Sequence, residues 1–341
     1  MPACARNLLV LLLVASRAWA WDYANHRLLS ELAIASLPAD FPAFTKTSNA
    51  IERIAFLSGE ADRWRNSPDL PLRHLNHPDH FFDFEYVEEL GLDPAKLSPF
   101  RYTFTDQLFT AHAKAGSKIK LGGSAGEAEQ TTLLIGFLPW AITEQYAKLK
   151  SSFSYLKTMQ EFGSAEEIEN AQANVIYNMG FLAHFPGDGS QPLHTTKHYN
   201  GWIGENPNRF TTNGYLHAWI DGGFLALHPP DRTAMRARVR PAQSLWNNGA
   251  REERADIFQE TVDWLRAQHV EVRPLYELEK QRAFGNGDTK AGVMFLEKQL
   301  LSGGHYLGDL WFTAWKEAQP DRYLIQYYRS QRAKAQNPPA P

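Results

Sequence analysis

Apolar residues recur every three or four positions along most of this chain, which is the spacing of helices that bury one face. The clearest example lies between residues 165 and 185, where one face carries Ile168, Ala171, Val175, Ile176, Met179 and Leu182. The same spacing predicts further helices over 26–37, 50–64, 215–227, 251–269 and 293–318, the last interrupted near Gly303-Gly304. Residues 81–86 are the best candidate for a short strand, because polar and apolar side chains alternate there. The pattern as a whole predicts an all-α fold.

Loops are expected where glycine, proline and asparagine gather, which is the case in 67–78, 122–126, 187–214 and 229–241. No internal repeat and no low-complexity linker divides the chain. We therefore expect one domain over residues 21–332, followed by a frayed tail over residues 333–341.

Residues 1–20 have the features of a secretory signal peptide. Arg6 precedes the apolar run LLVLLLVA, and Ala18-Trp19-Ala20 matches an A-x-A cleavage site. Cleavage after Ala20 would place the protein outside the cytoplasm, secreted or periplasmic, with Trp21 as its first residue. The free amine and the carbonyl of Trp21 could then chelate a metal ion, with His26 close by. No later segment carries the apolar stretch that a membrane-spanning helix needs, so we expect no stable membrane insertion.

Cys4 is the only cysteine and lies in this leader, so the mature protein would contain neither a disulfide nor a thiolate ligand. A metal site would have to use His, Asp, Glu and the backbone, which suits zinc. The whole chain has a net charge of −3, and the leader contains two arginines and no acid. Such a protein has no overall attraction for polyphosphates. If it handles nucleic acid or phospholipid, the positive charge must be local, and a bound metal ion is the obvious source.

Two pairs of histidine and aspartate have the spacing that places both side chains on one face of a helix. They are His184 with Asp188 and His217 with Asp221, each pair four residues apart. Between them lies the proline-bearing turn Gln191-Pro192-Leu193-His194. A single pair of this kind is most often a capping or core histidine with its partner. Two pairs with this turn between them are much harder to obtain by chance, and they indicate a metal site.

With these motifs the sequence resembles the S1/P1 nuclease family of secreted zinc enzymes, which is related to the bacterial zinc-dependent phospholipases C. The resemblance covers the tryptophan at the mature N-terminus, the H-x3-D-x2-Q-P-L-H motif and the later H-x3-D motif, in the order of the family. The central motif is specific, whereas the flanking helices agree only in pattern. The resemblance implies a single, mostly helical domain of the phospholipase C/P1 nuclease type with three zinc ions in a cleft.

The family pattern also assigns ligands to the three ions. Trp21, through its α-amine and carbonyl, would bind one ion together with His26. The second ion would be held by Asp62, His80 and His184. Asp188 would bridge these two ions. The ligands of the third ion would be His194, His217 and Asp221.

The resemblance implies catalytic roles for Asp62, Arg65 and Asp188. Asp62 matches the family aspartate that lies three residues before a basic residue, which is Arg65 here. A water held between the ions bridged by Asp188 would attack phosphorus, while Arg65 neutralises charge on the non-bridging oxygens. The activity implied by the family is hydrolysis of single-stranded RNA and DNA to 5′-phosphorylated products.

Phe81 and Asp83 are the implied substrate-binding residues. They follow His80 in an H-aromatic-x-D motif of the family, and this motif favours His80 as the ligand over His74 and His77. Phe81 would stack on a base, and Asp83 would accept a hydrogen bond from a base edge. The partner would therefore be single-stranded nucleic acid or nucleotides, bound by a monomer.

Other aromatic candidates and other functions remain open at this stage. Tyr199 and Trp202 lie on the glycine-rich loop after His194, where His198 is either close to the site or part of a solvated loop. The segment near 100–126 lengthens the chain relative to fungal family members, which leaves substrate specificity open. A phospholipase C or another phosphodiesterase on the same zinc scaffold is the main alternative. A non-catalytic zinc-binding protein is the third hypothesis.

Overall fold

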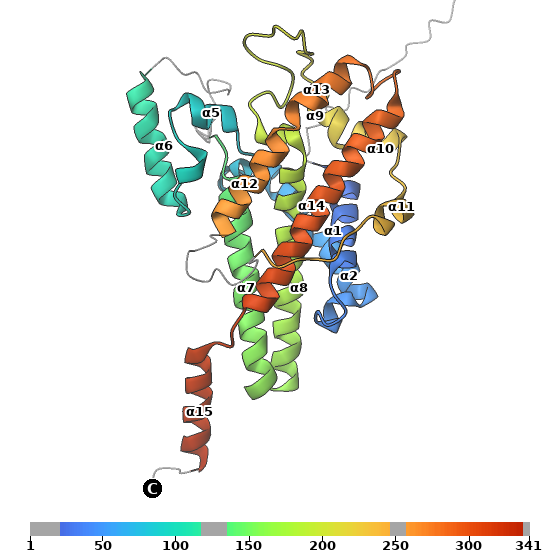
Figure 1. The fold of residues 1–341 in the computed structure, drawn as a ribbon. Helices are drawn as coiled ribbons and strands as arrows, with labels where there is room; N and C mark the ends of the chain where they lie inside the picture. The colour runs from blue at the N-terminus through green and yellow to red at the C-terminus, as the bar shows by residue number, and fades with distance from the viewer. Residues whose placement is uncertain (1–20, 117–134, 246–256, 337–341) are drawn as a thin grey trace, which may run out of the picture.

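The computed structural model describes residues 21–116, 135–245 and 257–336, and these residues form helices and loops without a β-strand (Figure 1). The all-α prediction is therefore confirmed for the described part of the chain. The α-helices are α1 (Tyr23–Ser36), α2 (Ser48–Leu57), α3 (Glu60–Arg65), α4 (Leu70–Asn76), α5 (Phe84–Glu89), α6 (Arg101–Ala115), α7 (Leu138–Phe162), α8 (Ala165–Ser190), α9 (Leu216–Ala218), α10 (Phe224–Leu227), α11 (Arg232–Ala237), α12 (Ile257–His269), α13 (Val272–Lys280), α14 (Thr289–Glu317) and α15 (Arg322–Gln336).

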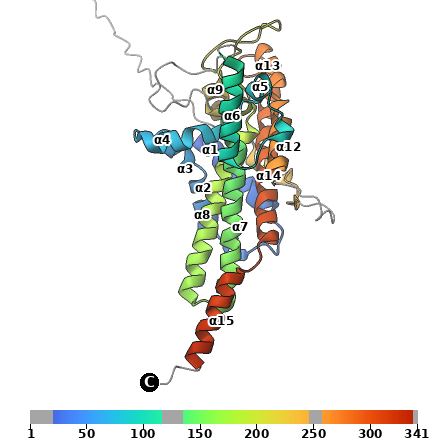
Figure 2. The same ribbon diagram turned by 90° about the vertical axis from the view of Figure 1, so that its left-hand side faces the viewer.

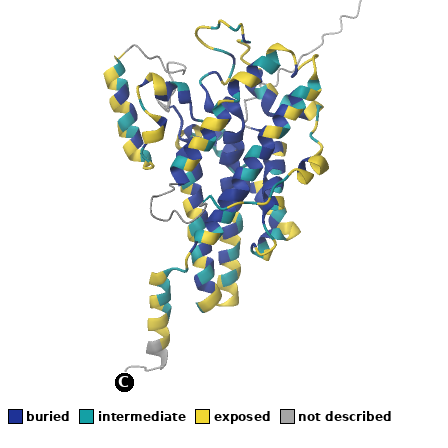
Figure 3. Ribbon diagram, viewed as in Figure 1, coloured by how far each residue is buried: buried dark blue, intermediate teal, exposed yellow. Residues whose placement is uncertain are grey.

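The long helices α7 and α8 form an antiparallel pair, and α1, α2 and α14 pack against α8 (Figure 1). Ser164 begins α8 with a capping box, in which its hydroxyl accepts from the Glu167 amide and the Glu167 carboxylate accepts from the Ser164 amide. Buried positions gather where α7, α8 and α14 meet, whereas the free ends of α7 and α8 are exposed (Figure 3).

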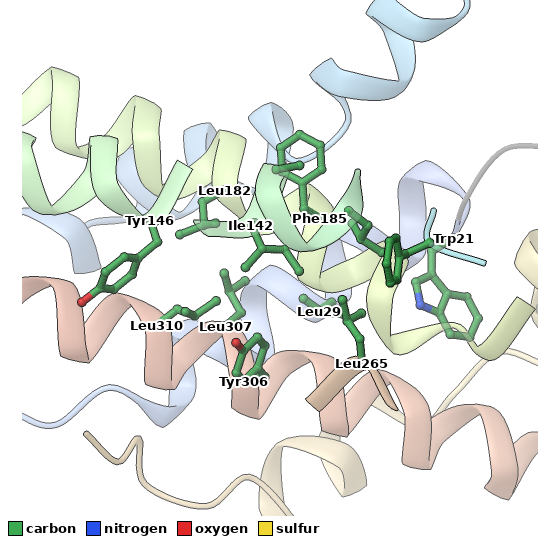
Figure 4. Close-up of a cluster of buried hydrophobic side chains, with 14 of the residues drawn as sticks. Trp21, Leu29, Ile142, Tyr146, Leu182, Phe185, Leu265, Tyr306, Leu307 and Leu310 are labelled. Atoms are coloured by element: carbon green, nitrogen blue, oxygen red, sulfur yellow. The ribbon is translucent and has the colours of Figure 1, made fainter. Parts of the chain in front are cut away.

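Large side chains from these helices fill the core. Figure 4 shows Ile142 of α7 beside Leu307 of α14. Trp21 is completely buried, as are Trp140 and Trp311. An apolar core of this size can stabilise the fold without disulfides.

Several helices agree with the predicted ones but differ in length. The helix predicted over 165–185 is α8, which continues through Pro186 to Ser190. The helix predicted over 50–64 is divided into α2 and α3 at Ser58 and Gly59. The interruption predicted near Gly303-Gly304 is wrong, since α14 is continuous there. A Cβ at position 303 would lie 2.6 Å from Leu29 Cδ1, so the glycine allows α1 to approach closely rather than ending the helix.

The strand predicted over 81–86 is also wrong. Residues 81–83 are extended, but α5 begins at Phe84. The alternation arises because Phe82 faces the core from the extended segment and Phe84 faces it from the first helical turn. Two predicted loops contain helices, since α4 lies within 67–78 and α11 within 229–241.

Other parts of the chain were not anticipated or are not described. The prediction overlooked α6, α7, α13 and α15, and α15 continues to Gln336. Figures 1 and 2 show α15 extending past the end of the α7–α8 pair. The predicted leader over 1–20, the loop over 122–126 and residues 337–341 of the tail lie outside the described residues. Among the described helices, none combines the length and the apolar character required to cross a membrane.

Candidate metal centre

The last turns of α8 carry His184 and Asp188 into the interior of the protein. Every residue from Met179 to Ser190 is buried, and the exposed fraction of both His184 and Asp188 is 0%. His184 Nε2 lies 3.2 Å from Asp188 Oδ2, as the four-residue spacing predicts. Two ionisable side chains on the apolar core face of a helix need partners, because uncompensated burial of a charge is costly.

His26 of α1 completes a first group with these two residues. Its ring stacks on the His184 ring with centroids 4.3 Å apart, and its Nε2 lies 3.5 Å from Asp188 Oδ1. Gly187 makes this approach possible, because a Cβ there would lie 2.5 Å from His26 Nδ1.

Asp62 of α3 and His80 form a second group with His184. His80 Nδ1 lies 2.9 Å from His184 Nε2, 2.8 Å from Asp188 Oδ2 and 3.8 Å from Asp62 Oδ1. The two oxygens of Asp188 therefore face different groups, Oδ1 towards His26 and Oδ2 towards His80. This is the arrangement that a bridging carboxylate requires.

Backbone hydrogen bonds from distant segments position His80. It ends the 3₁₀ turn His77–His80, and the Phe82 amide then donates to the His194 carbonyl at 2.9 Å. The Asp83 amide donates to the Ile135 carbonyl at 2.9 Å, and the Leu138 amide donates to the Phe81 carbonyl at 3.2 Å. Gly136 lies between these bonds with φ +96°, and a Cβ there would lie 1.9 Å from the Phe81 oxygen.

The third group consists of His194, His217 and Asp221. His217 Nε2 lies 2.9 Å from His194 Nε2 and 3.1 Å from Asp221 Oδ2. His217 is in α9, and Asp221 is in the π-helical turn Trp219–Gly223 that follows it. Gln191 fixes the carboxylate, since its amide nitrogen donates to Asp221 Oδ1 while its oxygen accepts from the Leu193 amide.

The donor atoms of the three groups fit a metal such as zinc. Ligand atoms around a tetrahedral zinc lie about 3.3 Å apart, which is close to the separations measured here. Hydrogen bonds to backbone carbonyls also orient the rings, from His184 Nδ1 to the Ser58 carbonyl at 2.7 Å and from His194 Nδ1 to the His80 carbonyl at 2.6 Å.

Several buried atoms of the groups have no hydrogen-bond partner, namely His26 Nδ1, His26 Nε2, Asp62 Oδ1, His80 Nε2, Asp188 Oδ1, His217 Nδ1 and Asp221 Oδ2. Unsatisfied buried donors and acceptors in such number indicate a missing partner.

Burial favours the neutral form, which binds metal, for four of the histidines in the groups, namely His26, His80, His194 and His217. Burial and the nearby Arg65 charge lower the pKa of His80 to about 3, and burial lowers the pKa of His217 well below its ordinary value. Burial acts to raise the pKa of Asp188, but the charges of His184 and His194 hold that pKa well below the ordinary value. Burial instead raises the pKa of Asp221 well above its ordinary value, and a cation bound beside this carboxyl would favour its ionised form.

Arg65 lies at the more accessible side of the centre. Its Nε is 3.3 Å from Asp62 Oδ1, and its charge contributes to the lowered pKa of His217. The exposed fractions of Arg65 and His217 are 9% and 7%, compared with 2% or less for the other side chains of the three groups. Arg65 and His217 are therefore the most exposed side chains around the groups.

Trp21 lies beside the third group. Its indole nitrogen donates to Ser190 Oγ at 3.0 Å, and the amide of the next residue, Asp22, donates to the Asp221 carbonyl at 3.1 Å. The buried indole thus anchors this end of the described chain near the third group. Chelation by the amine and carbonyl of Trp21 together with His26 stays a prediction.

The two predicted substrate-binding residues have different environments. Phe81 is half-buried, and its ring meets the His77 ring edge-on with centroids 5.7 Å apart. Asp83 is buried, and burial together with the nearby Glu85 raises its pKa well above the ordinary value. The role of Asp83 as an acceptor for a base edge stays a prediction.

The structure brings together every side-chain ligand that the sequence analysis named. It adds the supporting contacts of Ser58, Gln191 and Gly136, which that analysis did not assign. For Gln191 the sequence contained an indication of this role, because it belongs to the Q-P-L-H motif.

No protein-family model matches this chain, and no curated protein matches its sequence. The candidate centre therefore rests on the geometry and chemistry of its own residues.

Proposed function

We propose that this protein is an exported zinc-dependent phosphodiesterase of the S1/P1 nuclease type, which hydrolyses single-stranded RNA and DNA to 5′-phosphorylated products. The observation that carries the proposal is the presence of three buried His/Asp groups. The first and second groups share His184, and Asp188 contacts His26 of the first and His80 of the second. Exported chains of this type begin at a processed tryptophan, which would be Trp21 here.

The three groups would each hold one zinc ion. The first ion would be bound by Trp21 and His26. The second would be bound by Asp62, His80 and His184, and the third by His194, His217 and Asp221. Asp188 would bridge the first two. Zinc at these positions would supply Lewis acidity towards a phosphodiester and would favour deprotonation of water near neutral pH.

Arg65 and Asp62 would prepare the approach of the phosphate. The contact between them holds the guanidinium at the accessible side of the groups, where a fixed positive charge can pair with a non-bridging phosphate oxygen. Because the side chain is largely buried, its interaction with the phosphate would be screened less by water than that of a surface arginine. Asp188 would keep its negative charge throughout, in agreement with its lowered pKa.

Phe81 supports nucleic acid rather than phospholipid as the substrate. It follows the proposed ligand His80 directly, and its ring is half-buried. Backbone hydrogen bonds of Phe81 and Phe82 fix the segment that carries the ring. A base stacked on an aromatic ring contributes about 1–3 kcal/mol without requiring a particular sequence.

The test is a substrate panel with zinc-loaded protein that begins at Trp21. Single-stranded RNA, single-stranded DNA, 3′-nucleotides, phosphatidylcholine and bis-p-nitrophenyl phosphate would be compared. Phe81→Ala should raise KM for the oligonucleotides by about ten- to a hundredfold and leave the base-free diester nearly unchanged. Phe100→Ala is the matched control, because Phe100 is 71% exposed and contacts none of the metal groups. A preference for phosphatidylcholine would favour the phospholipase alternative, and absence of turnover on all substrates would contradict an enzymatic function.

A further inference from the structure

Helix α15 concentrates positive charge in a chain that is acidic overall. Residues 322–341 contain three arginines, one lysine and no aspartate or glutamate, whereas the whole chain has a net charge of −3. Arg322, Arg329 and Arg332 are exposed, and among the described residues no carboxylate forms an ion pair with any of them. The positive charge of α15 is therefore available to an anionic partner.

Contacts with α7 hold α15 in place along one face. The Asp321 amide donates to Thr158 Oγ1 at 2.8 Å, where α15 begins. The Tyr328 ring stacks on the Phe162 ring with centroids 5.8 Å apart and an interplanar angle of 10°. Much of the rest of the helix is exposed (Figure 3). The opposite face of α15 is thus presented to solvent on a fixed backbone.

The open face carries two tyrosines beside two arginines. Tyr323 and Tyr327 are four residues apart, so they lie together on one face of the helix, and their exposed fractions are 77% and 48%. The Tyr327 ring meets the Tyr328 ring edge-on, with centroids 5.5 Å apart, and is supported by it. Arg322 and Arg329 are seven residues apart and form a neighbouring stripe along the helix. We call these four residues, Arg322, Tyr323, Tyr327 and Arg329, the α15 face.

This composition matches single-stranded nucleic acid better than a lipid surface. Exposed rings stack on bases of any sequence, and guanidinium groups pair with the phosphates between them. A helix that lies on a membrane instead buries an apolar face. In α15 the aliphatic residues Leu324 and Ile325 are half-buried, while Gln326 and Ser330, which separate the tyrosines from the arginines, are polar and exposed. The α15 face therefore lacks the aliphatic side chains by which a helix enters a lipid surface.

The α15 face lies far from the metal groups. The helix adjoins Phe162 at the end of α7, whereas His184 lies in the last turns of α8. α8 runs antiparallel to α7 (Figures 1 and 2), and His184 is nineteen residues beyond Ala165, which begins α8. Nineteen residues of α-helix span about 28 Å. A dinucleotide cannot bridge this distance, but a longer single strand can.

We infer that the α15 face is a second binding surface for single-stranded nucleic acid, which retains long strands while the metal centre cleaves them. This inference rests on the proposed function and specifies its preferred substrate as strands long enough to contact both places. Binding at one place raises the effective concentration of the strand at the other. Affinity therefore increases with strand length without any new contact at the metal centre.

Binding to the zinc-loaded protein tests the inference without turnover. The probes are a long oligothymidylate and a thymidine dinucleotide in which a methylene group replaces each 3′ oxygen, so that the charge is kept and the 3′ bond cannot be hydrolysed. The double variant Tyr323→Ala/Tyr327→Ala should raise the Kd of the long strand by about ten- to a hundredfold and leave the Kd of the dinucleotide unchanged. Tyr323→Phe/Tyr327→Phe should bind as the wild type does, because both rings are retained.

The salt dependence of binding measures the contribution of the arginines. Each phosphate contact to a single strand contributes about 0.7 to the slope of log K against log salt, so Arg322→Gln/Arg329→Gln should reduce that slope by about 1.4 for the long strand. Tyr102→Ala and Arg238→Gln are the matched controls and should change neither Kd nor slope. Tyr102 of α6 is 89% exposed, and Arg238 is an exposed arginine that pairs with Glu297.

The possible outcomes separate this inference from the proposed function. Equal binding of the long strand by wild type and by both double variants would overturn the inference, and hydrolysis of nucleic acid by all three would leave the proposed function intact. If the tyrosine variant loses affinity but wild type hydrolyses no nucleic acid, the α15 face binds strands and the proposed function fails. Binding of wild type to phosphatidylglycerol vesicles but not to the long strand would assign the α15 face to a membrane and overturn the inference.

Discussion

The carboxamide of Gln191 holds two parts of the candidate metal centre at once. Its nitrogen donates to the Asp221 carboxylate, and its oxygen accepts from the Leu193 amide in the turn that presents His194. A residue of this kind determines the direction of a ligand without contacting the metal. Groups that orient ligands typically contribute about 10- to 100-fold to metal affinity.

Gln191→Ala should therefore weaken zinc binding by about 10- to 100-fold while the helical content stays unchanged. Competition with a chromophoric chelator measures the affinity, and circular dichroism measures the helix. Gln299→Ala is the matched control, because Gln299 is also buried, on α14, with an amide nitrogen that has no hydrogen-bond partner. Equal loss of affinity in both variants would show that Gln191 acts only through general stability.

At the same scale, the ligands differ in how far the sequence could reveal them. His184 with Asp188 and His217 with Asp221 could be paired from spacing alone, because one helical turn decides which side chains are neighbours. Asp62 and His80 could not, since 17 intervening residues fold through two helices and a 3₁₀ turn before the side chains meet. Only the resemblance to a family indicated them. The Ser58 carbonyl that orients His184 has no signal at all in the side-chain sequence.

Among the elements, the extended segment 81–83 is held by contacts with distant parts of the chain. It directly follows the proposed ligand His80 and carries the proposed substrate contacts Phe81 and Asp83, yet it forms no regular strand or helix. Its hydrogen bonds come from His194 and from residues 135–138, so no local periodicity could predict it. The sequence pattern instead favoured a strand there, whereas the long helix α8 was recognised because its apolar face repeats over many turns.

Gly136→Ala should disrupt this segment. Position 136 combines φ +96° with a Cβ that would overlap the Phe81 oxygen at 1.9 Å. The backbone strain alone costs about 1–3 kcal/mol, and moving Phe81 would displace the neighbouring His80. We expect a lower Tm and weaker zinc binding, measured by calorimetry and chelator competition.

Gly91→Ala separates strain from displacement. Gly91 has φ +72°, but a Cβ there would meet nothing within 4 Å. It should lower Tm through strain alone and leave zinc affinity intact. If Gly136→Ala leaves zinc affinity as unchanged as Gly91→Ala does, the segment does not depend on Gly136 for its position.

For the whole molecule, the buried imidazoles link stability to pH. The pKa of His80 falls from 6.5 to about 3 on folding, and burial also lowers the pKa values of His26, His194 and His217. Between pH 6.5 and 3 the unfolded chain therefore binds protons that the folded chain does not, and the free energy of unfolding decreases as the pH falls. Other groups oppose this trend. The nearby charges of Asp188 and Asp62 raise the pKa of His184 against the effect of burial, and burial raises the pKa values of Asp83, Asp221 and Asp79, that of Asp79 to about 6.

Metal-free protein should consequently lose stability steadily as the pH is lowered from about 6.5 towards 3. Urea unfolding in the presence of a chelator, repeated at several pH values, measures the slope. His80→Gln should flatten that slope, because it removes an imidazole whose pKa falls to about 3 on folding. A free energy of unfolding that rises on acidification would mean that the groups with raised pKa values, among them His184, Asp79, Asp83 and Asp221, dominate instead.

The metal groups also join segments that are far apart along the chain. His80 and His184 are separated by 104 positions, and His80 and Asp188 by 108. An ion bound between such residues acts as a cross-link, which closes a long loop and removes conformational freedom from the unfolded chain. A chain whose only cysteine, Cys4, lies in the predicted leader would obtain in this way the long-range ties that exported proteins often take from disulfides. The supply of metal outside the cytoplasm would then influence how much of the polypeptide reaches its folded state.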